Sequence, residues 1–562
     1  MYTQTKPRPR SITLQAIEGR PKQFFAEKLV FLVAVIGAFL LTGQFVAKYL
    51  VFSRYPFEDA AMLMRYALNL AQTGAIVWNV GGKPVDGGTD FLFLVTLAGV
   101  VKAGLSVEIA TRLLGIVAHL LTVVLVYMAI AWQQRGSRWL ALLSATYVAI
   151  GPGIAYISAY FGTTFFALFA CLTWYIANAV VKEDRVIGWS ILFACSSLLM
   201  GLARPEGVIL AVFMLVAVVS MKGIRKSREP IVIFLATFAL LGGLYFLWRW
   251  HYFGYPLPNP FYKKGGGHIY LTSLNESIHT VVQLCGPFPL ALLFGLRSRA
   301  MLKQAIFLLI PTAGFMLIWV LLSGEMNYVG RFQYAIMPIL LMSWPILVKG
   351  IQQDCRLPRL HMFNRRGQLI VLAVLCILSL STLWYQNSVD SQEIYFRDGK
   401  YDMAMMLRSY SQKHYTMATT EAGLLPLYSQ WRDIDTWGLN DQWIAHNGQI
   451  TAAYLDEYRP ELIMFHAPFS PVVSIVNRGN NEPWFRTWFP MLMILKQYAE
   501  SHGYILAASF GVSPYDTYYY YVRNDFADSS AIVQKIRDIP YYSYSTGEVC
   551  INYALLKAGG TR

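Results

Sequence analysis

Long runs of apolar residues dominate the first two thirds of the chain. A helix needs about 20 predominantly apolar residues to cross the hydrocarbon core of a bilayer. By this measure the sequence predicts about eleven transmembrane helices, roughly over residues 29–51, 109–132, 139–158, 161–180, 186–202, 206–221, 231–250, 278–296, 304–322, 333–348 and 368–385. A shorter apolar run over 91–103 is expected to lie at the membrane surface. The pattern is that of a polytopic α-helical membrane protein with juxtamembrane helices.

The pattern changes after residue 385, where long polar stretches begin. Short runs rich in β-branched and aromatic residues predict strands over 461–465, 504–510 and 517–522. Stretches with helical periodicity cover 403–413 and 489–502. This mixture is typical of a small α/β domain. We therefore expect a transmembrane domain over 1–385 and a soluble α/β domain over 386–562.

Composition agrees with a membrane protein. Of 562 residues, 56% are hydrophobic and only 14% are charged, whereas soluble domains carry roughly 25% charged residues. A soluble enzyme and a disordered scaffold are both excluded on this ground. No two of the six cysteines have the CxxC spacing of a metal site, so the sequence predicts no cysteine-based metal centre.

The distribution of charge predicts the topology. The tail over 386–562 carries 14 Lys and Arg against 18 Asp and Glu, a net charge of −4, so the chain's excess of +15 belongs to the membrane part. Basic residues cluster at the N-terminus and in the loops at 135–138, 182–185, 222–228, 297–303 and 349–366. All these clusters face the cytoplasm if 91–103 does not cross the membrane. The α/β domain then lies outside the cytoplasm.

The positive-inside rule does not explain the charged residues in the predicted outer loops. The basic ones are Lys48, Arg54, Arg65, Lys83, Lys102, Arg112, Arg204, Arg249, Lys263, Lys264 and Arg331. Because cations near a bilayer are energetically costly on the outer face, they usually mark a partner or a substrate. A signalling or structural membrane protein gives no reason for such residues in several separate loops.

Acidic residues accompany several of these cations. Glu58 and Asp59 stand side by side before an amphipathic helix, where helix capping is the alternative explanation. In Arg204-Pro205-Glu206 the two charges could instead form a structural bridge.

The loop over 249–264 combines three prolines, several aromatic residues and paired lysines at its end. The aromatic residues suit a membrane interface, whereas the lysines suit a bound phosphate. Arg331 ends the last outer turn, close to the membrane lip.

The order of these motifs resembles the GT-C superfamily of polytopic glycosyltransferases, and most of all the bacterial terminal arabinofuranosyltransferases. The segments that match are 58–60, 65–67, 77–82, 87–89, 204–207, 252–259, 261–264, 324–325, 328–332, 422–423, 428–429 and 434–441. The chain departs from the family pattern in having Glu58 and Glu325 in place of Asp, and Gly162-Thr163-Thr164 in place of Gly-Leu-Glu.

The resemblance implies a membrane glycosyltransferase, of the inverting kind, that moves D-arabinofuranose from a polyprenyl-phosphate donor to an acceptor hydroxyl. It implies a GT-C-like fold in a bacterial cytoplasmic (inner) membrane, with the C-terminal domain in the periplasm. The acceptor would be a cell-envelope glycan or a surface protein such as a pilin. Nucleic acid is not expected as a partner, no cofactor is identified, and a divalent cation stays open.

The candidate residues fall into three groups. Asp59 or Glu58 would be the catalytic base. The donor phosphate would be bound by Arg331, Lys263, Lys264, Arg204 and Arg249. Other substrate contacts would come from Arg65, His251, Tyr252, Asn259, Glu206, Glu325, Asn79 and Thr89. Two alternatives stay open at this point: a transporter or flippase of a lipid-linked sugar, and the same enzyme class with another donor such as mannose.

Overall fold

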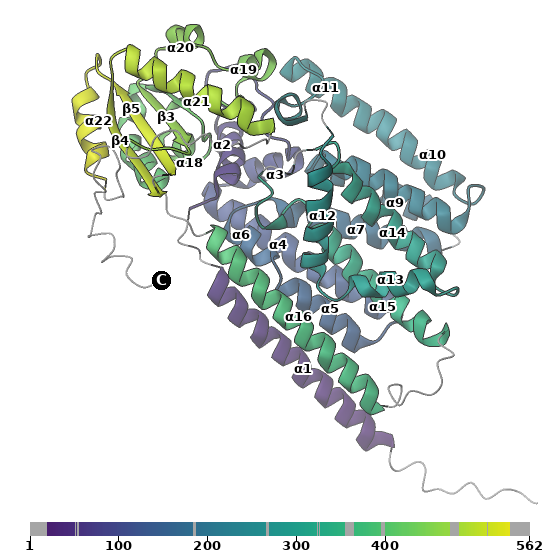
Figure 1. Ribbon diagram of the computed structural model, residues 1–562. Coiled ribbons are helices and arrows are strands. Elements are labelled where there is room, and N and C mark those ends of the chain that lie inside the picture. The colour runs from purple at the N-terminus through teal and green to yellow at the C-terminus, as the bar shows by residue number, and fades with distance from the viewer. Residues whose placement is uncertain are drawn as a thin grey trace, which may run out of the picture.

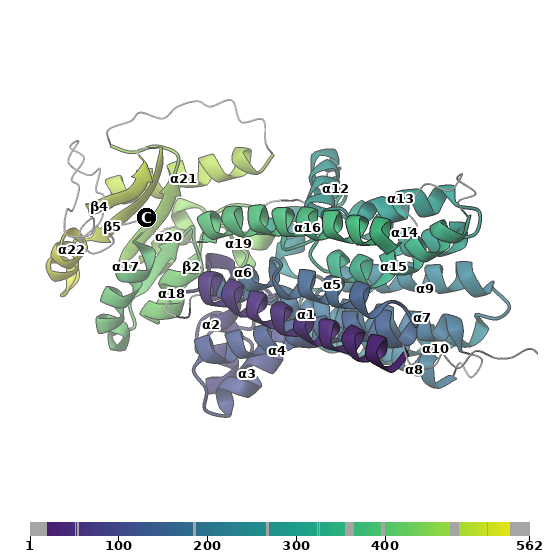
Figure 2. The same ribbon diagram turned by 90° about the horizontal axis from the view of Figure 1, so that it is seen from below.

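A helical bundle with a small sheet domain at one end makes up the protein (Figure 1). The computed structural model describes residues 20–50, 52, 55–183, 187–265, 269–322, 324, 326–354, 365–394, 399–471, 483–513 and 515–539. The sheet domain sits on the end of the bundle that carries α2, α3 and the end of α11, and Figure 2 shows the same arrangement from below.

The bundle is built from helices of very different lengths. They are α1 (Arg20–Tyr49), α2 (Glu58–Thr73), α3 (Phe91–Lys102), α4 (Val107–Met128) with η2 (Ala129–Gln133), α5 (Arg138–Ala149), α6 (Gly153–Ser158), α7 (Thr163–Lys182), α8 (Ile187–Ala203), α9 (Glu206–Lys222), α10 (Arg228–Thr237), η3 (Phe238–Gly242), α11 (Gly243–Phe253), η4 (Phe261–Gly265), α12 (Leu271–Cys285), α13 (Pro289–Arg297), α14 (Leu302–Ile318), η5 (Tyr328–Gly330), α15 (Ile336–Asp354) and α16 (Arg365–Ile394).

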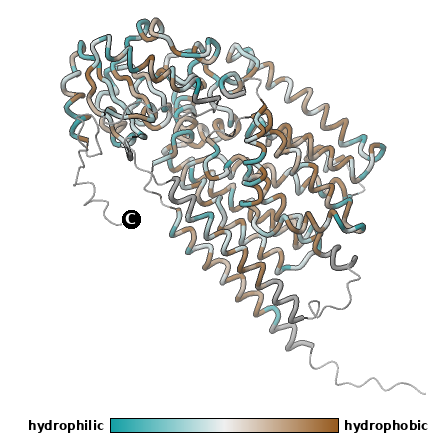
Figure 3. Tube along the Cα trace, viewed as in Figure 1, coloured by the Kyte–Doolittle hydropathy of each residue, from teal (hydrophilic) through white to brown (hydrophobic). Residues whose placement is uncertain are grey.

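Hydrophobic residues are concentrated in the long helices, whereas hydrophilic residues are frequent in the sheet domain and at the helix ends (Figure 3). Within the described residues, five helical segments are long and apolar enough to cross a membrane, namely Glu27–Tyr49, Val107–Gln133, Arg138–Ser158, Thr163–Lys182 and Arg228–Phe253. Shorter apolar helices occupy four further ranges, Phe91–Lys102, Ile187–Ala203, Leu302–Ile318 and Ile336–Val348. Helices therefore occupy the predicted spans, but the number that cross is not fixed at eleven.

The predicted span over 278–296 is wrong as one straight helix. The chain forms α12 and α13 there, and the two are bent by 104° relative to each other. Gly286 ends α12 with a backbone φ of +55°, in the left-handed region that favours glycine. Pro287 and Pro289 follow, and proline removes a helical hydrogen-bond donor. Hydropathy alone did not register this break.

α3 occupies the run that we expected at the membrane surface. Its 12 residues extend about 18 Å at 1.5 Å per residue, which is too short to cross a hydrocarbon core of about 30 Å. α3 packs against α2 and α4 instead. The length of α3 agrees with a juxtamembrane helix. That α3 lies on the outer side of the membrane stays a prediction.

The C-terminal domain is built on a five-stranded sheet with the order β2-β1-β3-β5-β4. Its strands are β1 (Thr416–Thr419), β2 (Arg432–Asp435), β3 (Leu462–Ala467), β4 (Tyr504–Ser513) and β5 (Asp516–Arg523). β1 pairs in parallel with β2 and β3, whereas β5 pairs antiparallel with β3 and β4. The three predicted strands are present, and the four-residue strands β1 and β2 were not anticipated.

Helices surround this sheet. They are α17 (Lys400–Leu407), η7 (Arg408–Lys413), α18 (Leu424–Ser429), α19 (Gln442–Asn447), α20 (Ala452–Tyr458), α21 (Pro483–Ser501) and α22 (Ser529–Arg537). α21 packs on β3 and β4, and α18 contacts α2 of the bundle. The contact between α18 and α2 joins the sheet domain to the first outer helix.

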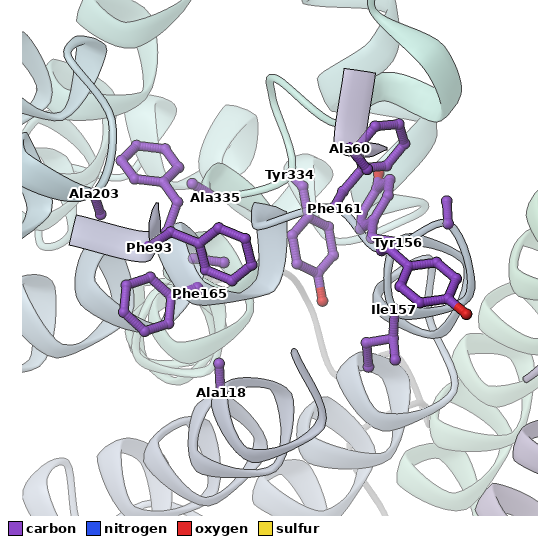
Figure 4. Packing of buried hydrophobic residues seen from close by; sticks show 14 of the residues in the cluster. Ala60, Phe93, Ala118, Tyr156, Ile157, Phe161, Phe165, Ala203, Tyr334 and Ala335 are labelled. Atoms are coloured by element: carbon purple, nitrogen blue, oxygen red, sulfur yellow. The ribbon is translucent and has the colours of Figure 1, made fainter. Parts of the chain in front are cut away.

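Buried aromatic side chains from several helices pack together in an aromatic core (Figure 4). Phe93 of α3 and Phe165 of α7 have ring centroids 5.5 Å apart, and Tyr156 and Tyr334 have centroids 4.9 Å apart. Phe161 is also buried and belongs to the same cluster. Arg331 packs against Phe161 of this core.

Candidate active site

The first turn of α2 and the turn after η5 bring Asp59 against Arg331. The Arg331 guanidinium donates to Oδ2 of Asp59, although the two residues are 272 positions apart in the sequence. The Asp59 side chain is 29% exposed and that of Arg331 is 8% exposed. An acid that solvent can reach is thus paired with a nearly buried cation.

The turn between α8 and α9 supplies a second cation to the same region. Arg204 bonds to Glu206 through Nε at 2.8 Å and also lies 3.7 Å from a carboxylate oxygen of Asp90. Asp59 acts electrostatically on Arg204, and Arg331 acts on Asp90. Two arginines and three carboxylates therefore form one charged cluster.

Phe332 connects the two arginines directly. The guanidinium carbon of Arg204 lies 5.2 Å from the centroid of this ring, and that of Arg331 lies 5.0 Å from it. Arg331 also lies over Phe161 of the aromatic core, at 4.3 Å. Its Nε is buried and has no hydrogen-bond acceptor among the described residues. An N–H of this kind is well suited to an anionic ligand.

The backbone before Arg331 is unusual. Val329 has a φ of +59° and Gly330 a φ of +67°. A β-branched residue is rare in this left-handed region and must be held there by its surroundings. The hydroxyl of Tyr156 donates to the carbonyl oxygen of Val329 at 2.8 Å. This bond holds the turn that places Arg331.

Glu58 points away from the cluster and toward the sheet domain. Its Oε1 accepts hydrogen bonds from the backbone N–H groups of Gly423 at 2.8 Å and Leu424 at 3.0 Å. Its Oε2 lies 3.3 Å from Nζ of Lys400. The two adjacent acids thus have different surroundings, which sequence reasoning left open.

Arg65 and Asn79 lie between the bundle and the sheet domain. The buried guanidinium of Arg65 donates to the carbonyl oxygens of Trp78, Pro426 and Trp431 and to the side chain of Asn79. Asn79 also exchanges two hydrogen bonds with the backbone of Asp433, at 2.8 and 2.9 Å. Their polar groups are used in joining the domains, and the structure gives them no place beside Asp59.

Asp433 of β2 is buried next to Arg65 and Asn79. It interacts with Trp78 and Arg65 of the bundle and with Thr419 of the sheet domain. It accepts from the indole N–H of Trp78 at 3.1 Å and from Thr419 at 2.8 Å. Burial raises the pKa of Asp433 to about 8, although the nearby Arg65 opposes the shift. Arg65 and Asp433 therefore both lie inside the interface, shielded from water.

Three further predicted residues, Arg249, Tyr252 and Asn259, lie in a separate region. Arg249 is paired with Asp86, whose pKa is raised to about 6 by burial despite that arginine. The backbone N–H of Asn259 donates to the Asp86 carbonyl at 3.0 Å, and its side-chain amide donates to Leu439 at 3.2 Å. The Tyr252 hydroxyl accepts from the N–H of Ile76 at 2.9 Å. These contacts shape the loop over 74–90.

The remaining candidates are more scattered. Lys263 donates to the carbonyl oxygen of Gly448 at 2.7 Å, and burial lowers its pKa. His251 is exposed on α11, and Thr89 donates to Asp90 at 3.2 Å. The side chain of Lys264 and the whole of Glu325 lie outside the described residues.

An apolar cavity of about 280 Å³ opens beside the charged cluster. Its walls come from α8, α9, η3 and α11, with Thr89 and Pro205 at the turns that carry Asp90 and Arg204. The apolar lining includes Leu198, Leu202, Val208, Phe238, Tyr245 and Phe246. Arg249 and Asp86 are its charged residues.

Sequence reasoning missed Asp90, Lys400, Glu421, His466 and Asp516 as members of charged clusters. Glu421 directly precedes the Ala-Gly step that matches the family pattern, so this signal was available. Within the described part of the chain, no group of three or more His, Cys, Asp or Glu side chains is arranged to hold a metal ion.

Comparison with known proteins gives a fold rather than a family. The sequence model called Domain of unknown function (DUF8728) matches residues 389–523, which is only the C-terminal part. No curated protein matches the sequence. The apo structure of ArnT from Cupriavidus metallidurans superposes with a TM-score of 0.55 at 11% identity, covering 88% of this chain and 98% of ArnT.

The chain has the fold of ArnT. The structure of ArnT bound to undecaprenyl phosphate gives a TM-score of 0.53, again at 11% identity, with 86% of this chain and 97% of ArnT covered. The archaeal oligosaccharyltransferase AglB from Archaeoglobus fulgidus gives 0.48 at 11% identity, with 87% and 74% covered. At this identity the likeness to ArnT shows a shared fold alone, and membership of the GT-C superfamily stays a prediction. The arabinofuranosyltransferase assignment stays a prediction.

Proposed function

We propose that this protein is a membrane glycosyltransferase that moves a sugar from a polyprenyl-phosphate donor to an acceptor hydroxyl on the outer face of the membrane. The observation that carries the proposal is the pairing of Asp59 with Arg331 beside Arg204. The transfer needs a carboxylate to take a proton and fixed cations to bind a phosphate, and this cluster supplies both. The likeness to ArnT, which has been solved with undecaprenyl phosphate, supports a lipid-phosphate ligand.

Arg331 and Arg204 are the proposed phosphate ligands. The leaving group is a phosphate that gains negative charge in the transition state, so cations held in place before the reaction stabilise that state. The unpaired Nε–H of Arg331 gives it capacity for a further acceptor. Phe332 and Phe161 fix the plane of its guanidinium from two sides.

Asp59 is the proposed base. It takes the proton from the acceptor hydroxyl while that oxygen attacks the anomeric carbon and the bond to phosphate breaks. Asp59 pairs with one terminal nitrogen of the Arg331 guanidinium, whereas the Nε–H of Arg331 is left for the donor phosphate. The same arginine therefore holds the base and the phosphate side by side. One such base is sufficient for an inverting transfer.

The apolar cavity is the proposed site of the donor's hydrocarbon chain. It begins at the turns that carry Asp90 and Arg204 and runs between α8, α9 and α11. The outer surface of α10, η3 and α11 exposes apolar side chains such as Leu240, Leu244 and Leu247, which suits contact with lipid. A polyprenyl chain could therefore reach the cavity from the bilayer while its phosphate lies at the arginines.

The ordered motifs favour D-arabinofuranose as the sugar, with mannose as the alternative within the same enzyme class. The proposed acceptor is an envelope glycan or a surface protein such as a pilin. The proposed location is a bacterial inner membrane, with residues 386–562 forming an extracytoplasmic domain. Comparing envelope glycans and surface proteins by mass spectrometry, with and without the gene, would identify both sugar and acceptor.

The direct test is transfer by the purified protein in proteoliposomes. Synthetic polyprenyl-phosphate arabinofuranose and polyprenyl-phosphate mannose would be supplied separately, each with a sugar acceptor, and release of polyprenyl phosphate would be measured. The proposal predicts release with one donor and its loss in Asp59→Asn. Movement of an intact lipid-linked sugar across the membrane, without cleavage, would instead favour a flippase and contradict the proposal.

A further inference from the structure

A network of charged side chains begins at Glu58, one residue before the proposed base. Glu58 is bound by two backbone N–H groups of the sheet domain, those of Gly423 and Leu424, and by Lys400. Its side chain is 13% exposed, against 29% for Asp59. The first turn of α2 is therefore attached to the sheet domain through an almost buried carboxylate.

Lys400 links this carboxylate to the sheet itself. Its side chain is only 6% exposed, and its Nζ lies 3.4 Å from Glu421 and 3.3 Å from the hydroxyl of Tyr518. The same ammonium lies 4.6 Å from the centroid of the Tyr518 ring. Because Tyr518 is part of β5, Lys400 is held against a strand in the interior of the sheet order.

Glu421 and His466 extend this network of charged side chains. Nδ1 of His466 lies 3.1 Å from Glu421, and its Nε2 bonds to Asp516. Burial alone would raise the pKa of Glu421, but Lys400 and His466 lower it to about 2. The acids and bases thus alternate from Glu58 to Asp516, and each charge has an opposite neighbour.

Tyr328 brings this network next to the candidate active site. Burial raises the pKa of Tyr328, and charges of both groups act on it: Glu421 and Asp59 raise it further, whereas Lys400 and Arg331 lower it. Its ring packs on Phe57, the residue before Glu58, with centroids 4.3 Å apart. The network and the reacting cluster therefore meet at the first turn of α2.

We propose that Glu58 and Lys400 are positioning residues through which the sheet domain aims Asp59 at the reacting atoms. This inference rests on the proposed function. Oε1 of Glu58 accepts two backbone hydrogen bonds and its Oε2 is ion-paired with Lys400, so Glu58 is less free than Asp59 to accept a proton from a hydroxyl. An anchor at residue 58 fixes the backbone of residue 59, and a misplacement of about 1 Å in a catalytic group can cost a hundredfold in rate.

The experiment measures kcat and donor KM for Glu58→Gln, Glu58→Ala, Lys400→Met and Asp59→Asn in the full chain. Gln keeps an oxygen that accepts from Gly423 and Leu424 but loses the charge that pairs with Lys400. Glu58→Gln should therefore lose less rate than Glu58→Ala and much less than Asp59→Asn. Glu58→Ala and Lys400→Met should lower kcat about 10- to 100-fold and leave donor KM within about threefold. Lys413→Met, which changes a lysine that is 56% exposed on the same domain, is the matched control and should be unchanged.

The combined variant Glu58→Ala with Lys400→Met should be no slower than the worse single variant, because both remove one attachment. If Glu58→Gln loses as much activity as Asp59→Asn, Glu58 is a base and the positioning role is overturned. Full activity in Glu58→Ala also overturns it. If Asp59→Asn keeps its activity, the proposed function itself fails, which is a distinguishable result.

Discussion

Replacing Arg65 should lower the stability of the protein rather than its affinity for a substrate. The sequence predicted a substrate contact, whereas the structure buries its guanidinium between the bundle and the sheet domain. Four hydrogen bonds leave it, to the carbonyl oxygens of Trp78, Pro426 and Trp431 and to the side chain of Asn79. Replacing it by Met keeps most of the length but removes all four.

The expected cost follows from these contacts. A hydrogen bond that involves a charged group contributes roughly 1.5–3 kcal/mol, and contributions within one network are not additive. The guanidinium also lies 4.7 Å from the centroid of the Trp78 ring, worth roughly 1 kcal/mol. Arg65→Met should therefore destabilise the protein by roughly 4–6 kcal/mol, which for a chain of 562 residues corresponds to a fall in Tm of about 3–5 °C.

The assay is thermal unfolding of the purified protein in detergent, followed by tryptophan fluorescence. Lys83→Met is the control, because Lys83 is exposed in the same outer loop. Arg65→Lys should also lose stability, since an ammonium cannot reproduce the fork of a guanidinium. A Tm within about 2 °C of the parent for Arg65→Met, together with a raised substrate KM, would refute the structural role.

Three further predictions concern the phosphate, pH and topology. Arg331→Gln should lose roughly 2–4 kcal/mol of transition-state stabilisation, a rate loss of about a hundredfold or more in single-turnover transfer; an unchanged rate would remove its phosphate role. Burial lowers the pKa of His466, but Asp516 and Glu421 outweigh burial and raise it to about 9, so its stabilising effect is complete below about pH 6.5 and is lost as pH rises through about 9. Tm should therefore fall between pH 7 and 10 and fall less in His466→Gln; equal slopes would contradict this. Reporter fusions after Gly136 and Gly223 should face the cytoplasm and one after Tyr401 the outside, and the opposite sides at Gly136 and Tyr401 would overturn the topology.

The long helices could be predicted from the sequence because an apolar run of about 20 residues has few other uses. The break at Gly286 could not be predicted from hydropathy, since the end of α12 and the whole of α13 are apolar and the hydropathy runs on across the turn. β1 and β2 have four residues each, and strands this short carry too few alternating positions to be recognised.

The candidate site was predictable in its residue types but not in its pairings. Glu58 and Asp59 are neighbours in the sequence, yet successive residues of a helix point in directions about 100° apart. One therefore reaches the sheet domain and the other reaches Arg331. Asn69, four residues after Arg65, is also buried. That polar stripe along α2 was a signal that this face meets a polar partner.

The central claim is that Asp59 is the base of a transfer from a lipid phosphate. The most direct measurement is single-turnover transfer from a synthetic polyprenyl-phosphate sugar to a sugar acceptor, by the parent and by Asp59→Asn, at matched expression and Tm. Asn keeps the shape and the contact with Arg331 but cannot take a proton, so we predict a rate loss of roughly 10²–10⁴-fold with donor binding retained. Equal turnover by the two proteins would contradict the assignment of catalysis to this cluster.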